Sequence, residues 1–373
     1  MAGLIAHDDS YYISQKLIHP LGMNTAPPTS VCILRLSAIG DICHTLAVVR
    51  ALQTAWPQTR FTWIIGKLEA KLLSHLPDIE FIVYDKRSGL KGYWQLRQQL
   101  QQRHFDVLLH MQLSIRASAL ALLVNAKMKL GFDRARAREL QWLFTNKRIA
   151  PQQNQHVLDG LFGFADYFGI TRQPPRWNIH LPENTLHYAQ QVIPDQQPTL
   201  VISPCSSHTL RNWRAEYYAH VADYAVKELG MRVLICGGPS ALEKDMGNAI
   251  CAHMQQPATN LVGKDTLLQF LATLQRAHVL ISPDSGPAHM ATAVGTPVIG
   301  LYAATNPARS GPYLSRQWCV DAYALAAQQF KQQPAEALAW TTKIESPSVM
   351  DLITPKHVIE KLSALMTSSP TRS

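Results

Sequence analysis

The sequence has 373 residues, of which 47% are hydrophobic and 16% charged, and its formal net charge is +9. This composition builds buried cores and excludes wholesale disorder. At about 100–200 residues per domain, the length favours two domains. The six cysteines form no C-x-x-C pair, which disfavours a disulfide scaffold and a zinc ribbon and fits a reducing compartment. The longest strongly apolar stretch, Ala117 to Val124, is far shorter than the about 20 residues of a bilayer span, so no transmembrane helix is expected.

The positive charge is concentrated in the first half of the chain. Residues 31–173 carry 19 Lys and Arg against 10 Asp and Glu, whereas residues 174–373 carry 15 against 14. A basic half beside a neutral half indicates an anionic partner such as nucleic acid, an acidic membrane or an acidic glycan. A basic surface that serves only solubility is the alternative.

The first 30 residues differ from the rest and are predicted to form an extension, disordered or of non-native origin. No apolar segment follows a basic start, so these residues do not resemble a secretory signal. Strand character begins at Val31, and Met23 precedes it by eight residues. Our hypothesis is that Met23 is the natural start. Intact-mass spectrometry of the endogenous protein would contradict it by finding residues 1–22.

In residues 31–175, short apolar runs alternate with helical patterns. Strands are predicted at Val31–Leu36, Phe61–Ile65, Phe81–Val83 and Val107–His110. Helices are predicted where apolar residues recur at helical spacing, at Ile42–Ala55, Trp94–Gln102 and Ile115–Asn125. This βαβ alternation predicts a parallel sheet with helices on both faces.

A Pro-rich stretch follows, and residues 176–198 are predicted to connect two domains. The alternation resumes in residues 199–350, with strands at Leu200–Ser203, Val233–Cys236, Val279–Ser282 and Val298–Tyr302 and helices at Ala215–Leu229, Leu267–Ala277 and Pro287–Val294. Residues 351–373 are predicted to form a helix, Pro355–Met366, and a tail. The fold class is therefore α/β, with two Rossmann-like βαβ domains facing each other across a cleft. Ligands bind beyond the carboxyl ends of such strands.

The segment from Arg35 to Asp41 follows the first strand and opens the first helix. Gly40 allows a close approach of the backbone. Asp41 is placed at a helix N-terminus, where the helix dipole favours the carboxylate form. An ionised carboxylate there can take a proton from a sugar hydroxyl as a general base. The alternative is that Asp41 only caps the helix.

The segment from Pro283 to His289 (PDSGPAH) follows a strand and precedes a helix. Ser285 can cap this helix, Gly286 clears space and Pro287 suits the first helical position. The free N–H groups predict a cradle for a diphosphate. The segment lacks the G-x-x-x-x-G-K-[ST] and G-x-G-x-x-G patterns, which disfavours a P-loop NTPase and a dinucleotide site. His289 could hydrogen-bond a phosphate or a sugar, or be structural.

Three further groups of residues could contact a ligand. In the loop after the strand Leu200–Ser203, Ser206 offers a hydroxyl and Arg211 a bidentate phosphate contact. Glu243 follows a Gly-Gly turn and could meet a ribose. A basic cluster lies in the first half, made of Arg134, Arg136, Arg138, Lys147 and Arg148. Ordinary polar loops and a solvated basic face are the alternatives.

Other reaction classes lack their motifs. The 15 His residues show no H-E-x-x-H or paired ligand spacing, and no G-x-S-x-G elbow is present, so no metal site is expected. No recognised RNA or DNA motif occurs and basic–aromatic interleaving is sparse, so nucleic acid is not the expected partner.

Together, the motifs resemble those of glycosyltransferase family 9, the ADP-heptose:lipopolysaccharide heptosyltransferases. The resemblance spans about residues 31–315 in the family's motif order. It is carried by Ile33–Leu46 (ILRLSAIGDICHTL), Arg138-Glu139, Leu143–Arg148 (LFTNKR), Gln155-His156, Arg211–Trp213 (RNW), Gly237–Ser240 (GGPS), Asp284–His289 (DSGPAH), Gly300–Tyr302 and Thr305–Pro307.

This resemblance implies a GT-B fold in which the N-terminal domain, residues 31–175, holds the acceptor and the C-terminal domain, residues 199–350, holds the nucleotide sugar. It also implies inversion at the anomeric carbon without a metal or other cofactor. One base suffices for such a single displacement. Asp41 matches the family's general base, a role that it can combine with capping.

The expected site residues divide into two sets. The donor set comprises Ser206, Arg211, Glu243, Asp284, Ser285, Gly286 and His289, and the acceptor set comprises Arg35, Gly40, Arg134, Arg136 and Arg138. Arg211 stands where the family has a Lys for the diphosphate, which keeps the charge and changes the geometry. Arg214 and Ala303 stand where the family often has Pro and Gly, and these departures remove no reacting group.

We therefore expect transfer of heptose from ADP-heptose to the Kdo- or heptose-bearing inner core of lipopolysaccharide. Kdo-lipid A or a heptosylated core is the expected acceptor, since its anionic groups suit the basic half. The expected location is the cytoplasm, peripheral to the anionic inner membrane. The alternative is a GT-B glycosyltransferase or epimerase that uses another nucleotide sugar.

Overall fold

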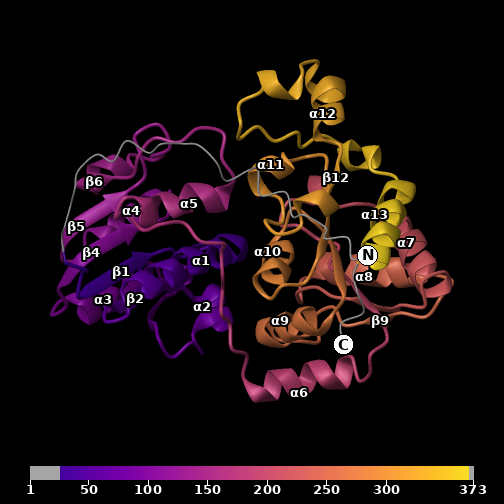
Figure 1. The fold of residues 1–373 in the computed structure, drawn as a ribbon, viewed down its shortest axis with the longest axis horizontal. Coiled ribbons are helices and arrows are strands. Elements are labelled where there is room, and N and C mark those ends of the chain that lie inside the picture. Colours follow the sequence, from indigo (N-terminus) through magenta and orange to yellow (C-terminus); the bar gives the residue numbers. More distant parts are fainter. Residues whose placement is uncertain (1–25, 369–373) are drawn as a thin grey trace, which may run out of the picture.

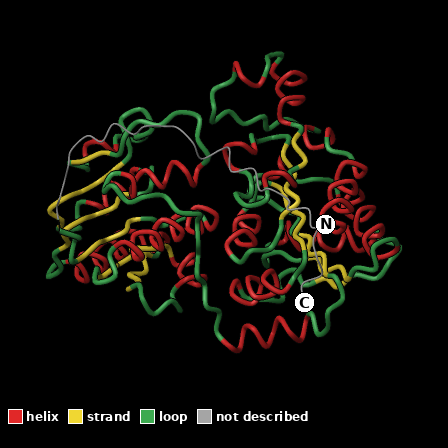
Figure 2. The backbone as a smooth tube through the Cα atoms, viewed as in Figure 1, coloured by secondary structure: helices red, strands yellow, loops and turns green. Residues whose placement is uncertain are grey.

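The computed structural model describes residues 26–368. The predictions for Met23 and for the first 25 residues lie outside the described part of the chain. Two six-stranded sheets form, with the orders β3-β2-β1-β4-β5-β6 and β12-β11-β10-β7-β8-β9. Their paired strands run parallel. Figure 1 shows the two halves side by side, and Figure 2 shows helices flanking the strands of each. This is the predicted α/β class with the two-domain GT-B arrangement.

The first sheet and its helices occupy the N-terminal half. Its strands are β1 (Ser30–Leu34), β2 (Arg60–Gly66), β3 (Glu80–Tyr84), β4 (Phe105–His110), β5 (Ala126–Gly131) and β6 (Lys147–Arg148). Its helices are α1 (Ile39–Ala55), α2 (Lys67–Leu73), α3 (Gly89–Leu100), α4 (Ile115–Ala121) and α5 (Val157–Asp166). Short helical turns are η2 (Lys86–Ser88) and η3 (Gln141–Leu143).

The second sheet occupies the C-terminal half. Its strands are β7 (Thr199–Ile202), β8 (Arg232–Ile235), β9 (Thr259–Asn260), β10 (Val279–Pro283), β11 (Val298–Tyr302) and β12 (Val320–Asp321). Its helices are α7 (Ala215–Lys227), α8 (Ala241–His253), α9 (Leu267–Arg276), α10 (Gly286–Ala293), α11 (Pro307–Ser310), α12 (Tyr323–Ala326) and α13 (Pro355–Ser368). Short turns are η4 (Thr209–Arg211), η5 (Arg316–Trp318), η6 (Ala327–Lys331), η7 (Ala335–Ala337) and η8 (Val349–Leu352).

The central strands are buried on both faces, which explains their continuous apolar runs. In β1, Val31 and Ile33 face a core shared with α1 and α5, whereas Cys32 and Leu34 face a core shared with α3 and α4. In the second half, α13 adds Val358, among other residues, to the core around β7 and β8.

Three differences from the predicted elements have local causes. The helix predicted at Ile115–Asn125 ends at Ala121, because the next residues form tight turns that lead into β5, so that end of the prediction was wrong. No pattern predicted β5, since two lysines interrupt its sequence AKMKLG. The predicted connection contains a helix, α6 (Glu183–Val192), which buries few side chains and therefore has a weak apolar signal.

The passage between the halves follows Asn178. The Arg50 side chain on α1 donates to the carbonyls of Trp177 (3.0 Å) and Asn178 (3.2 Å), and the Trp177 indole donates to the Cys43 carbonyl at 2.8 Å. α6, by contrast, packs on α9 in the second half. We propose that the boundary between the two domains lies here, within the connection predicted at 176–198.

The halves meet through α1 and α10, which pack together and lie side by side at the centre of Figure 1. α1 follows β1 and α10 follows β10, so the N-terminal turn of each helix lies at the carboxyl edge of its sheet. The two carboxyl edges therefore meet where the sequence motifs were placed.

Candidate active site

Asp41 lies in the first turn of α1 and is not the cap residue. Ala38 holds the N-cap position, and its N–H donates to Asp41 Oδ2 at 3.3 Å. The Arg35 guanidinium forms an ion pair with the same oxygen. The Asp41 side chain is 35% exposed, and none of the described residues donates a hydrogen bond to Oδ1. One carboxylate oxygen is thus held by the protein while the other is open to a ligand.

Arg35 is fixed at the edge of the sheet. Its Nη1 donates to the carbonyl of Met111, the residue after β4, while its Nη2 pairs with Asp41. The Arg35 side chain is 11% exposed, and among the described residues its buried Nε has no partner. The sequence placed Arg35 on the acceptor side, and its geometry makes it the residue that orients Asp41.

Glycines allow the two halves to approach closely. A β-carbon on Gly40 would overlap the ring of His289, and one on Gly286 would lie 3.2 Å from the β-carbon of Ile39. The His44 ring also contacts His289, with a centroid separation of 4.5 Å. Burial holds the pKa of His44 well below its usual range and lowers that of His289, although Asp284 and Asp41 act on His289 in the opposite direction. The imidazoles at this contact are therefore neutral, packed side chains.

His156 links the halves by a hydrogen bond. Its Nδ1 accepts the Leu158 N–H at 3.1 Å as the N-cap of α5, so its Nε2 carries the proton and donates to the Gly311 carbonyl at 2.8 Å. Burial lowers the pKa of His156 to about 3. The sequence analysis identified His156 only as part of the Gln155-His156 motif. Its hydrogen bond to the other half is visible only in the tertiary structure.

Among the residues predicted to bind the donor, Arg211 is held by two carboxylates. Its Nη2 and Nε donate to Glu345 Oε1 at 2.6 and 3.0 Å, and its Nη1 lies 3.5 Å from Asp284 Oδ2. The Ser310 hydroxyl donates to the same Asp284 oxygen at 3.4 Å. The sequence predicted Arg211 and Asp284 but not Glu345, which lies 134 residues from Arg211 in a segment without a motif.

The first turn of α10 lies in the segment that the sequence predicts to bind a diphosphate. Ser285 is the N-cap residue but makes no capping hydrogen bond through its side chain, and Pro287 lies at the start of the helix. The Ser285 hydroxyl pairs instead with that of Ser282 at 2.8 Å. Helix N–H groups without a side-chain cap are free to bind phosphate oxygens. Nearby, Ser206 is buried and its N–H donates to Asn212 Oδ1 at 2.7 Å.

Arg309, on α11, was not among the residues predicted from the sequence, and it directly precedes Ser310, whose hydroxyl donates to Asp284. Burial lowers its pKa, while the charges of Asp284 and Asp41 raise it and those of Arg138 and Arg211 lower it. The charged groups that act on Arg309 therefore come from both halves. It follows the Thr305–Pro307 motif by two residues, a signal that could have identified it.

Other predicted residues serve the structure. Arg136 pairs with the buried Asp133 and donates to the Ala150 carbonyl at 3.3 Å, so its guanidinium is engaged within the fold. Glu243 accepts the Gly238 N–H at 2.7 Å and the Ser240 hydroxyl at 2.6 Å, and both of its oxygens thereby hold the turn before α8.

The remaining basic residues are more accessible. Arg134 is exposed and lies 4.8 Å from the ring centroid of Trp142, and Arg138 donates to the Thr341 hydroxyl of the second half at 3.4 Å. Within residues 26–368, no group of three or more His, Cys, Asp and Glu side chains is arranged to hold a metal ion. No helix in this range is both long and apolar enough to cross a membrane.

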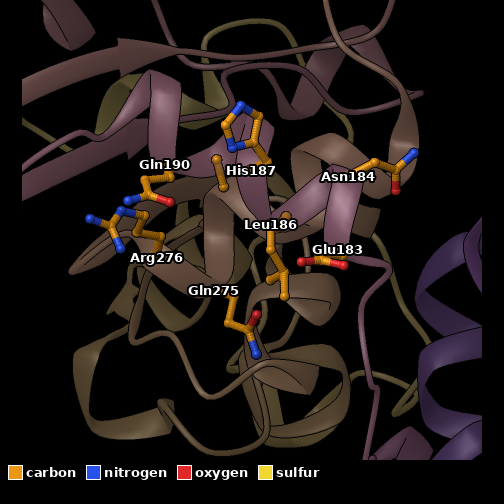
Figure 3. Close-up of a pocket in the computed structure, with 9 residues that line it drawn as sticks. Glu183, Asn184, Leu186, His187, Gln190, Gln275 and Arg276 are labelled. Atoms are coloured by element: carbon orange, nitrogen blue, oxygen red, sulfur yellow. The ribbon is translucent and has the colours of Figure 1, made fainter.

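A separate depression lies between α6 and α9, and its lining includes Glu183, His187, Gln190 and Arg276 (Figure 3). Arg276 donates to the Ile193 carbonyl, which helps to hold the end of α6 on α9. None of the predicted site residues lines this depression. It therefore belongs to the packing of the interdomain connection.

Comparison with known proteins identifies the family of the chain. The family described as glycosyltransferase family 9 (heptosyltransferase) matches residues 93–339. The lipopolysaccharide core heptosyltransferase OpsX of Haemophilus influenzae is 43% identical over 341 residues, which cover 91% of this chain and 98% of that protein.

Two solved structures share the fold. A family 9 glycosyl transferase from Veillonella parvula has a TM-score of 0.76 at 22% identity and covers 91% of this chain and 98% of that chain. E. coli heptosyltransferase WaaC with ADP has a TM-score of 0.70 at 20% identity and covers 90% of this chain and 99% of that chain. The match to the family model and the 43% identity to OpsX show that the chain belongs to glycosyltransferase family 9 and is a glycosyltransferase of the heptosyltransferase type.

Proposed function

We propose that this enzyme transfers heptose from ADP-heptose to the Kdo- or heptose-bearing inner core of lipopolysaccharide. One observation carries the proposal: the contact of Gly40 with His289 brings the first turn of α1, which contains Asp41, against α10, the helix that follows Asp284 and Ser285. The name of the H. influenzae relative, a lipopolysaccharide core heptosyltransferase, supports transfer of heptose to the lipopolysaccharide core.

Asp41 is the general base of this proposed reaction. Arg35 and the Ala38 N–H hold Oδ2, so Oδ1 is the atom that takes the proton from the acceptor hydroxyl. The acceptor oxygen then forms a bond to the anomeric carbon while the bond from that carbon to the diphosphate oxygen breaks. The electron pair of the broken bond leaves with ADP. A single displacement of this kind inverts the anomeric configuration.

Hydrogen-bond donors and positive charges near the start of α10 stabilise the leaving diphosphate. The first turn of α10 supplies N–H groups, and the guanidinium groups of Arg211 and Arg309 supply full charges. We propose that these groups make the reaction independent of a metal ion. Arg211 exchanges its contact with Glu345 for the diphosphate when the donor binds.

The acceptor binds on the N-terminal side. Of the predicted acceptor residues, Arg134 and Arg138 are exposed and can meet the anionic Kdo and lipid A phosphates, whereas Arg136 is engaged with Asp133. Because the acceptor is a lipid, we propose that the enzyme acts at the cytoplasmic face of the inner membrane as a peripheral protein.

The test is ADP release from ADP-heptose, with and without Kdo-lipid A and in the presence of a chelator. The wild type is expected to release ADP only when acceptor is present. Asp41→Asn is expected to lower the rate about 100-fold or more while ADP still binds, because only the base is lost. Asp245→Asn, an exposed acid on α8, is the matched control and keeps full activity.

Three results would each contradict a part of the proposal. If Asp41→Asn no longer binds ADP, Asp41 does not act only as the general base. If the chelator abolishes ADP release, the reaction depends on a metal ion. Release from a different nucleotide sugar, but not from ADP-heptose, would favour the alternative donor.

A further inference from the structure

α3 and α4 cover the same face of the first sheet. Both helices contribute to one core beneath them, α3 through Leu96 and Leu100 and α4 through Ala117 and Leu120. Their outer sides nevertheless expose large apolar side chains: Leu90 is 79% exposed, Trp94 58% and Ile115 54%. We call the outward side chains of Leu90, Lys91, Trp94, Arg97, Ile115 and Arg116 the α3–α4 face.

The charge of this region is strongly one-sided. From Lys86 to Phe132 the chain has eight Lys or Arg and one acidic residue, Asp106, which pairs with Lys127 at 2.7 Å. On the α3–α4 face itself, Lys91, Arg97 and Arg116 are exposed.

Two contacts on and beside the α3–α4 face involve an aromatic ring and a carboxylate. The Arg97 guanidinium lies 5.1 Å from the Trp94 ring centroid, so a cation and an aromatic ring share the surface. The Glu139 carboxylate accepts the Ile115 N–H at the edge of the face. The face therefore combines exposed apolar side chains with an excess of positive charge.

The position of the face relates it to the acceptor side. α3 and α4 begin beyond the carboxyl ends of β3 and β4, the edge at which Arg35 and Asp41 also lie. Leu90 and Ile115, in the first turns of the two helices, are the members of the face nearest to this edge. A surface bound there would deliver a lipid-linked acceptor toward Asp41.

We propose that the α3–α4 face docks on an anionic lipid bilayer, with Leu90, Trp94 and Ile115 entering the headgroup region and Lys91, Arg97 and Arg116 contacting lipid phosphates. This combination of a Trp, aliphatic residues and cations is the one that interfacial helices use. Nucleic acid would use the cations but leave the Leu and Ile side chains exposed. The inference rests on the proposed lipid-linked acceptor and names the surface that reaches it.

Vesicle flotation tests the docking surface. The wild type is expected to float with phosphatidylethanolamine vesicles that contain phosphatidylglycerol and not with phosphatidylcholine vesicles. Leu90→Ser/Trp94→Ser and Lys91→Glu/Arg97→Glu are each expected to weaken binding about tenfold or more. Leu242→Ser/Leu325→Ser, which alters exposed leucines of the second half, is the matched control and binds as the wild type.

Trp94 provides a direct readout of insertion. Brominated lipid is expected to quench part of the protein fluorescence in the wild type but not in Trp94→Phe. Because Trp94 is exposed, neither variant at this position should change the melting temperature. The proposal would be overturned if both α3 variants floated as the wild type does, or if the control lost vesicle binding to the same extent. Binding to duplex DNA but not to vesicles would also overturn it.

ADP release separates this inference from the proposed function. With a soluble acceptor that lacks acyl chains, Leu90→Ser/Trp94→Ser is expected to match the wild type, and with vesicle-borne acceptor it is expected to be slower. If neither the wild type nor any variant releases ADP, but the α3 substitutions still weaken flotation, the proposed function fails and the docking surface stands. If release is acceptor-dependent but flotation ignores α3, only the docking surface fails.

Discussion

Gly40 of α1 and His289 of α10 are packed so closely that a β-carbon on Gly40 would overlap the His289 ring. The two residues lie on helices of different halves, so the absence of a side chain at one position sets how near the two carboxyl edges approach. The base and the donor turn are therefore positioned by a steric contact between the halves.

Gly40→Ala should separate the N-terminal turns of α1 and α10. Alanine favours a helix by about 1 kcal/mol over glycine, so a loss of activity would come from the overlap and not from the helix itself. We expect kcat to fall about tenfold or more, because small displacements of a base are costly. Gly247→Ala is the control: its β-carbon would lie 2.7 Å from Val262 inside the second half, which should lower the melting temperature but not kcat.

Arg35→Lys tests whether Arg35 positions Asp41. Lysine keeps the charge but cannot contact the Met111 carbonyl and Asp41 together as the guanidinium does. The expected result is a fall in kcat of about tenfold with an unchanged Kd for ADP. Arg103→Lys, which alters the surface pair with Glu80, should leave both values unchanged. If Arg35→Lys binds ADP more weakly, Arg35 contacts the donor instead of positioning Asp41.

Glu345→Gln tests the exchange at Arg211. The hydrogen bond from Arg211 lowers the pKa of Glu345, so the carboxylate that the donor must displace is ionised at neutral pH. Removing its charge should free Arg211 and lower the Kd for ADP several-fold, as isothermal calorimetry would measure. Glu336→Gln, an exposed acid in η7, is the matched control. A higher Kd would show instead that Glu345 holds Arg211 in its binding position.

His156→Asn probes the pH dependence of the interface. Because burial lowers the pKa values of His156, His44 and His289, the unfolded chain binds protons below about pH 6.5 that the folded chain does not. Stability should therefore fall as the pH drops from that value, by up to about 1.4 kcal/mol per pH unit for each such histidine.

The asparagine keeps an oxygen to cap α5 but cannot reach the Gly311 carbonyl. His156→Asn should thus be less stable at about pH 7.5 and lose less stability at about pH 5.5 than the wild type, as urea midpoints would measure. His253→Asn on the surface of α8 should follow the wild-type curve. A wild-type slope in His156→Asn would mean that His156 does not contribute to the pH dependence.

Glu243→Ala distinguishes a ribose contact from a structural role. Since both carboxylate oxygens hold the turn before α8, we expect a loss of about 1 kcal/mol of stability and little change in ADP affinity. Glu243→Gln, which keeps one acceptor oxygen, should lose less. If both variants bind ADP more weakly and keep the wild-type melting temperature, Glu243 contacts the ribose of the donor.

Local patterns were sufficient for most of the central elements. The apolar runs of β1 and β10 and the helical spacing of α7 and α9 place these elements within a few residues of where they lie, because buried parallel strands and amphipathic helices have distinctive periods. β5 and α6 were not predicted, because polar residues interrupt the periodic pattern of each.

The sequence by itself also identified the family and predicted most of the candidate site, including Asp41, Arg211 and Asp284, because motifs at strand ends and helix starts are local. It could not determine which residues meet across the halves. The pairing of Arg211 with Glu345, the His156–Gly311 hydrogen bond and the place of Arg309 depend on how two separately formed sheets pack. Such contacts join residues far apart in the chain, so no local period encodes them and only the tertiary structure decides them.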